Sequence, residues 1–160
     1  MESNSKLIEQ AGKEPHWLAK ARNFCTYQER CQQELRDKLY DWKAKPDEVE
    51  ETISAMISEG FLDEERYAKA FAGGKFRIKK WGKRKIIYAL KAKQISDYCI
   101  KKGLLEIDEE DYLATLQSVL LSRDRNYKNV GPIKQKQLAT YLIGRGFESD
   151  LVWKCIKTKD

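Results

Sequence analysis

The sequence predicts an all-α protein made of three tandem three-helix repeats, which together would form an elongated, curved modular array. The first observation is internal repetition, because shifting the 160-residue chain against itself by 51 and then 52 residues aligns three segments without a gap. The second is the four-residue spacing of apolar residues, which is typical of short amphipathic helices. The third is composition, since three prolines and nine glycines are few for a turn-rich sheet protein.

The aligned apolar positions define the expected core of each repeat. Because each repeat can bury only a small core, we expect neighbouring repeats to stabilise one another. We place the repeats at residues 16–62, 63–107 and 108–160, after a flexible N-terminal segment at residues 1–15. The positions that coincide are Leu35, Ile86 and Leu138; Leu39, Leu90 and Leu142; Ala44, Ile95 and Phe147; Val49, Ile100 and Val152; and Ile53, Leu104 and Ile156.

A leading helix is predicted before each aligned pair. In the first repeat, Thr26–Glu29 is typical of a capping box that starts the following helix. In the second repeat, Asp63 suits the N-cap of the leading helix, and we expect Gly73 and Gly74 to end it. In the third repeat, Asp108 takes the capping position, and Pro132 suits the first position of a later helix.

Composition and motifs limit the functions that we expect. No apolar run reaches the roughly 20 residues that cross a bilayer, and no secretory signal is visible, so we expect a cytoplasmic protein without a membrane partner. The four cysteines lack CxxC spacing and His16 is the only histidine, so we expect free thiols, no metal and no cofactor. No phosphate loop, zinc-protease helix or hydrolase elbow occurs, and we predict that the protein is not an enzyme.

Basic residues are concentrated in the second repeat. Between Glu65 and Asp97 there are eleven lysines and arginines and no acidic residue. The rest of the chain has 20 basic and 25 acidic residues, a net charge of −5. A run of charge often forms only a solvated helix face, but such faces usually mix both signs. The segregation therefore predicts a positive surface that binds a polyanion.

Three motifs lie in and around this run: "GFLDEERYA" at Gly60–Ala68, "WGKRKI" at Trp81–Ile86 and "LKAKQI" at Leu90–Ile95. In this order they resemble the RecX family of recombination regulators. The helix at Tyr27–Leu39 is also similar to the family's first-repeat pattern, and the resemblance extends over about residues 16 to 157. Two departures are "AGG" before the basic run and "KQIS" in place of the commoner "KGI", which could alter the turn before the next helix.

The resemblance implies a regulatory protein that binds the RecA recombinase, chiefly as the filament that RecA forms on single-stranded DNA. It also implies inhibition of the ATPase and strand-exchange activities of RecA, and so a role in recombination, DNA repair and the SOS response. Weak, non-specific binding to single-stranded DNA is implied as well. The charge pattern agrees, because a nucleoprotein filament is a large polyanion. We expect a monomer.

The densest basic residues are the candidates for contact with RecA or DNA, although each of them could also face only solvent. Phe76 and Ile78, which alternate with them, are expected to face the core. Trp81 could stack on a base or pack between repeats. The secondary candidates for contact with RecA or DNA are Trp81, Lys134, Lys136 and Arg145. The primary candidates are Lys75, Arg77, Lys79, Lys80, Lys83, Arg84, Lys85, Lys91 and Lys93.

Two other classes of protein fit parts of the pattern. A helix-turn-helix regulator that binds duplex DNA would explain the recurring pairs of short helices. The helices that begin at Asp47, Ser96 and Glu148 are acidic or short, however, which suits a phosphate-lined groove poorly. A purely structural repeat adaptor would leave the basic run unexplained.

Overall fold

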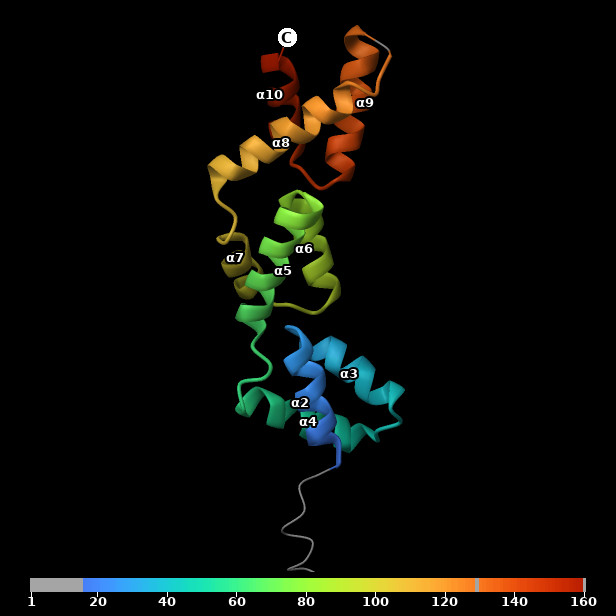
Figure 1. Cartoon of the computed structure of the whole chain (residues 1–160), viewed down its shortest axis with the longest axis vertical. Coiled ribbons are helices and arrows are strands. Elements are labelled where there is room, and N and C mark those ends of the chain that lie inside the picture. Colours follow the sequence, from blue (N-terminus) through green and yellow to red (C-terminus); the bar gives the residue numbers. More distant parts are fainter. Residues whose placement is uncertain (1–15, 129, 160) are drawn as a thin grey trace, which may run out of the picture. The chain divides into compact units, whose positions relative to one another are not determined.

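The computed structural model describes residues 16–128 and 130–159; the predicted flexible segment, residues 1–15, lies outside the described residues. Within the described ranges the chain forms nine helices and no strand, which confirms the all-α prediction. The helices follow one another in three groups of three (Figure 1). They are α2 (His16–Tyr27), α3 (Gln32–Asp41), α4 (Pro46–Ser58), α5 (Glu64–Lys79), α6 (Lys83–Ala92), α7 (Asp97–Leu104), α8 (Glu109–Asp124), α9 (Gly131–Gly144) and α10 (Ser149–Lys159).

The chain divides between Asp63 and Glu64 into two compact units. The first unit contains α2, α3 and α4, and the second contains α5 to α10. The second and third helix groups are therefore joined in one unit by their mutual contacts. The limits of the three separate repeats stay a prediction.

The first unit has its own hydrophobic core, formed by the facing sides of its three helices. Ala21, Leu35, Leu39 and Val49 are completely buried in it. The predicted capping box at Thr26–Glu29 is wrong. Helix α2 continues to Tyr27, so the Thr26 hydroxyl donates to the carbonyl of Arg22 at 2.6 Å, within its own helix.

One turn geometry joins the two aligned helices of every group. In each turn one residue has a positive φ: Lys43 (69°), Gln94 (64°) or Gly146 (102°). The next residue donates its backbone N–H to a carbonyl five residues earlier, as in a Schellman motif. Fourteen of the fifteen aligned apolar residues are buried, and Leu104 is half-buried, so the predicted core is confirmed. The three backbone bonds are Ala44 to Leu39 at 3.0 Å, Ile95 to Leu90 at 3.1 Å and Phe147 to Leu142 at 3.2 Å.

Helix α5 is longer than the sequence predicted. Gly73 and Gly74 do not end it, because it continues to Lys79. Phe76 is buried as expected, but Ile78 is 78% exposed. The backbone there is helical and not extended, so side chains two positions apart point about 200° away from each other. An alternating pattern therefore cannot place both residues in the core.

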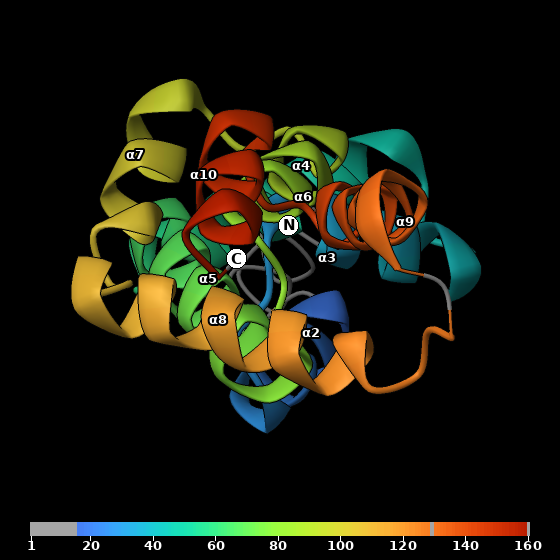
Figure 2. The same ribbon diagram turned by 90° about the horizontal axis from the view of Figure 1, so that it is seen from above.

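The second unit is tightly packed around α5 and α8. A Cβ added to Gly103 of α7 would lie 2.7 Å from the carbonyl oxygen of Ala68 in α5, so glycine permits this close approach. Asp108 caps α8 as predicted, accepting the N–H of Asp111 at 3.1 Å. Helices α9 and α10 lie on the same side of α8 (Figure 2). Pro132 is the second residue of α9 and not the first.

Candidate nucleic-acid interface

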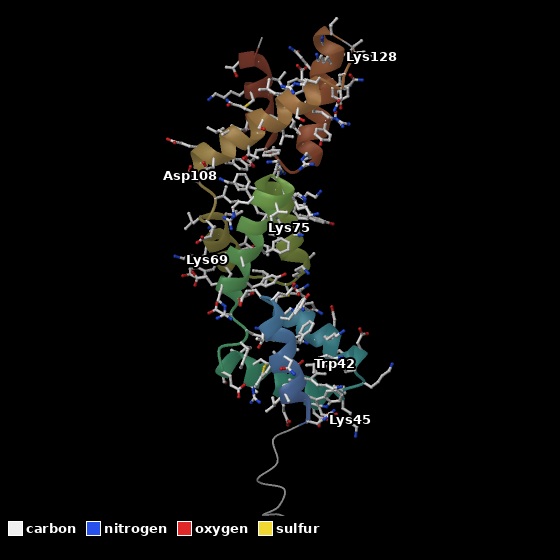
Figure 3. The ribbon with its side chains drawn as sticks, in the orientation of Figure 1. Trp42, Lys45, Lys69, Lys75, Asp108 and Lys128 are labelled. Carbon is white, nitrogen blue, oxygen red and sulfur yellow. The ribbon has the colours of Figure 1, made fainter. Side chains whose placement is uncertain are left out.

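The predicted contact residues lie on the second half of α5, on α6 and on the turns that follow these helices. We call residues 75–93 the basic segment. Lys75, Lys83 and Lys93 are half-buried, whereas the other six candidates have exposed side chains. Lys75 is labelled on α5 in Figure 3. The exposed candidates are Arg77, Lys79, Lys80, Arg84, Lys85 and Lys91.

Trp81 connects α5 to α6 and is engaged by neighbouring side chains. Its ring packs edge-on against Phe71, with ring centroids 6.4 Å apart. The Nζ atoms of Lys75 and Lys85 lie 5.0 Å and 4.5 Å from the indole centroid, within the range of cation–π attraction. These contacts favour packing over base stacking as the role of Trp81, and they hold two of the candidate cations against the ring.

Lys83 is tied to the third helix group. Its ammonium group forms an ion pair with Glu109 of α8 and lies 4.6 Å from the centroid of the Tyr112 ring. Its backbone N–H donates to the Tyr112 hydroxyl at 3.0 Å, and that hydroxyl donates to Glu148 at 2.5 Å. The charge of Lys83 is therefore neutralised within the protein.

The N-terminus of α6 is closed by the turn between α9 and α10. The N–H groups of Gly82 and Arg84 donate to the carbonyls of Arg145 and Gly146, each at 2.9 Å. A Cβ on Gly82 would lie 2.1 Å from the carbonyl carbon of Gly146, so the two backbones touch. Helix N-termini bind anions through free N–H groups, and those of Gly82, Lys83 and Arg84 are already hydrogen-bonded within the protein. A polyanion at α6 would have to be held by side chains.

Sequence reasoning missed one residue of this surface, Tyr88. It is 78% exposed and lies on the same face of α6 as Arg84 and Lys91, four residues before it and three after it. An exposed aromatic ring between cations is a stacking platform for unpaired bases. The signal was available, because Tyr88 falls outside the aligned core positions of its helix.

The secondary candidates in the third helix group differ in their surroundings. Lys134 pairs with Asp124 at 2.8 Å, and both side chains are largely buried. Lys136 is exposed. Arg145 is half-buried and donates to the carbonyls of Lys79 and Lys80, at 3.2 Å for Lys80, so it caps the C-terminus of α5.

In the described part of the chain no cluster of three or more histidines, cysteines or carboxylates could hold a metal ion. None of its helices is long and apolar enough to cross a membrane. None of Cys25, Cys31, Cys99 and Cys155 forms a disulfide, and burial raises the pKa of Cys25 to about 11. The absence of cofactors and of enzymatic activity stays a prediction.

The fold and the basic segment define a helical-repeat protein with a cationic middle group. Family models support a closer assignment: residues 18–55 match the first three-helix domain of RecX, and residues 63–104 match the second. The chain belongs to the RecX family, a family of regulatory proteins.

Individual relatives agree with this assignment. The chain is 28% identical to the regulatory protein RecX of Clostridium acetobutylicum over 87% of its own length and 66% of that protein. It is 26% identical to the Listeria monocytogenes protein of the same name, over 94% of this chain and 56% of the relative. The chain thus spans between about half and two thirds of these relatives. The crystal structure of RecX from Lactobacillus salivarius has the same fold, with a TM-score of 0.77 at 21% identity over 88% of this chain and 92% of that one.

Proposed function

We propose that the protein binds the RecA recombinase, chiefly as its filament on single-stranded DNA, and inhibits the ATPase and strand-exchange activities of RecA. It would thereby regulate recombination, DNA repair and the SOS response in the cytoplasm, acting as a monomer. Direct binding to single-stranded DNA would be weak and independent of sequence, because contacts to phosphates carry no sequence information.

The observation that carries this proposal is the group of exposed cationic side chains on the second helix group in a member of the RecX family. Arg77, Lys79, Arg84 and Lys91 present their charges to solvent on two adjacent helices. A DNA filament concentrates negative charge along its length, and binding such a polymer releases its condensed counterions. A surface of this kind therefore gains affinity from the filament that it would not gain from an isolated small anion.

The test is a charge reversal of Arg77, Lys79, Arg84 and Lys91 to glutamate. Lys83 is left unchanged because its ion pair with Glu109 belongs to the junction between helix groups. We expect the variant to keep its helicity by circular dichroism, and to need at least about tenfold more protein for half-inhibition of the RecA ATPase on single-stranded DNA.

The control reverses four lysines that are also exposed but lie outside the basic segment: Lys43, Lys101, Lys154 and Lys157. Both variants change the net charge by the same amount, so a non-specific electrostatic effect would weaken them equally. Inhibition by the control should remain close to that of the unmodified protein. If the unmodified protein leaves RecA activity unchanged, the proposed function is wrong.

The alternative, a helix-turn-helix regulator of duplex DNA, has less support. The second helix of each aligned pair would be the recognition helix. Its first turn carries Asp47 and Glu48 in α4, Asp97 in α7 and Asp150 in α10. Carboxylates at these positions would face phosphates in a major groove, which is electrostatically unfavourable.

A further inference from the structure

A pocket of about 300 Å³ lies within the second unit, where the end of α5 meets α8 and the C-terminal half of α9. Its lining contains three cationic side chains, four polar side chains and no carboxylate. Three cations without a carboxylate make this concave site electropositive. Low-dielectric walls focus such a field and attract anions. The cations are those of Lys80, Arg123 and Arg145, and the polar residues include Ser118, Ser122 and Asn126.

Arg123 is held in place by aromatic neighbours. Its guanidinium carbon lies 4.2 Å from the centroid of the Tyr141 ring, and its Nε–H donates to the Tyr127 hydroxyl at 3.3 Å. That hydrogen bond raises the pKa of the guanidinium. No carboxylate in the described residues pairs with Arg123. The charge is thus fixed in position and remains available to a ligand.

Arg145 contributes an unsatisfied donor to the same pocket. One end of its guanidinium is committed to the carbonyls of Lys79 and Lys80, and the other donates to the Tyr141 hydroxyl at 3.4 Å. Its Nε–H is buried and has no acceptor among the described residues. Buried donors are normally paired, and an exception calls for an explanation. A small rotation toward an anion in the pocket would satisfy it.

Lys80 brings the basic segment to the edge of the pocket. It has a φ of 54°, a conformation that a lysine adopts only at a cost. The contact from Arg145 to its carbonyl holds this backbone in place. Residues kept in such conformations are concentrated at functional sites. The same arginine thus fixes the position of Lys80 and lines the pocket beside it.

We propose that this pocket binds one phosphate group of a nucleic-acid strand, with Arg123 as the principal ligand and Lys80 and Arg145 as supporting cations. Arginine forks match the geometry of phosphate oxygens, and serine hydroxyls and an asparagine amide add neutral donors. The volume is at the small end for ligand sites, so it suits a phosphate with its sugar and not a large cofactor. The identification of the ligand as a nucleic-acid strand rests on the proposed function. The binding of a phosphate group in the pocket does not depend on RecA.

The first measurement is binding of a fluorescent oligothymidylate to the protein alone, as a function of salt. Arg123→Gln and Lys80→Gln should each weaken binding about tenfold, because each removes a charge-assisted contact. Arg123→Gln, which removes the principal ligand, should also reduce the slope of log K against log salt by up to about 0.7, the value for one phosphate contact on a single strand. Lys43→Gln is the matched control, since Lys43 is also an exposed lysine with positive φ that follows a helix.

The second measurement separates the pocket from the rest of the basic surface. Oligothymidylate should shift the Nε–H signals of Arg123 and Arg145 in 15N-resolved NMR spectra, both in the unmodified protein and in Lys91→Gln. Unchanged signals at saturating oligothymidylate would overturn the proposal. So would a response to inorganic phosphate or thymidine monophosphate without a response to the oligonucleotide, because the site would then serve small anions. Neither experiment contains RecA, so the pocket and the regulation of RecA can fail independently.

Discussion

The turn at Gly146 and the turn at Gln94 have the same backbone geometry but very different surroundings. Both residues have positive φ, and in both turns the next residue donates to a carbonyl five positions back. Gln94 is exposed, whereas Gly146 is buried against the start of α6. The aligned residue in the first unit, Lys43, is exposed like Gln94. The local chain geometry is therefore repeated three times, but only one copy is an interface.

This difference explains why glycine occurs in one turn and not in the others. A Cβ on Gly146 would lie 2.4 Å from the Cβ of Lys85 and 2.7 Å from its backbone nitrogen. At Gln94 and Lys43 only the cost of a left-handed backbone opposes a side chain, about 1 to 2 kcal/mol per residue. Positive φ alone is tolerated on the surface, and the additional requirement for close approach makes glycine necessary at Gly146.

The largest effect is expected from Gly146→Ala. We expect a loss of about 3 kcal/mol in the free energy of unfolding, because the methyl group meets α6 in addition to the cost of positive φ. Gly60→Ala separates these two terms, since Gly60 has a φ of 80° and nothing lies near its added Cβ. It should lose only about 1 kcal/mol. Equal losses in urea denaturation would show that the α6 contact does not matter.

Tyr112→Phe tests the hydrogen bonds beside that contact. Removing the hydroxyl leaves the N–H of Lys83 and the carboxylate of Glu148 without this partner, at a cost of about 2 kcal/mol. Burial, and then the hydrogen bond to Glu148, raise the pKa of Tyr112 above its usual range. The stabilisation should therefore be fully present below the unfolded pKa of about 10 and be lost as the pH rises above it.

The measurement is the difference in unfolding free energy between the unmodified protein and Tyr112→Phe at increasing pH. Other tyrosines titrate in both proteins, so their contributions cancel in the difference. We expect this difference to shrink as the pH rises beyond about 10. A difference that stays constant into that range would mean that the folded state does not favour the protonated form of Tyr112, so that its pKa is not raised there.

The contrast between the repeated turn geometry and the contacts made by only one of the turns also shows what the sequence could and could not predict. The helix pairs and their cores were predictable because burial imposes a period, and the residues from Leu35 to Ile156 that keep this period are buried with one partial exception. The prediction that Gly73 and Gly74 end a helix was wrong. A glycine signals a helix end only when no tertiary contact favours continuing the helix, and Gly73 is buried within α5.

The candidate site was only partly predictable, for a related reason. The count of charges located the basic segment, but the partners of its residues come from distant parts of the chain. The pairing of Lys83 with Glu109 and the capping of Lys80 by Arg145 depend on how helix groups dock. No periodic pattern encodes that docking. Tyr88 was predictable, because an exposed aromatic between cations can be recognised from helical spacing alone.

The smallest effect, and a stabilising one, is expected from Gln94→Gly. Glycine removes the cost of positive φ but loses more chain entropy on folding, so the net gain should be about 0.5 to 1 kcal/mol. Lys43→Gly should give a similar gain in the first unit, because its backbone and exposure match. Urea denaturation of both variants measures these gains. A loss of stability in Gln94→Gly would mean that the Gln94 side chain makes stabilising contacts that outweigh the cost of its positive φ. Backbone strain and close approach would then not be enough to explain the difference between Gln94 and Gly146.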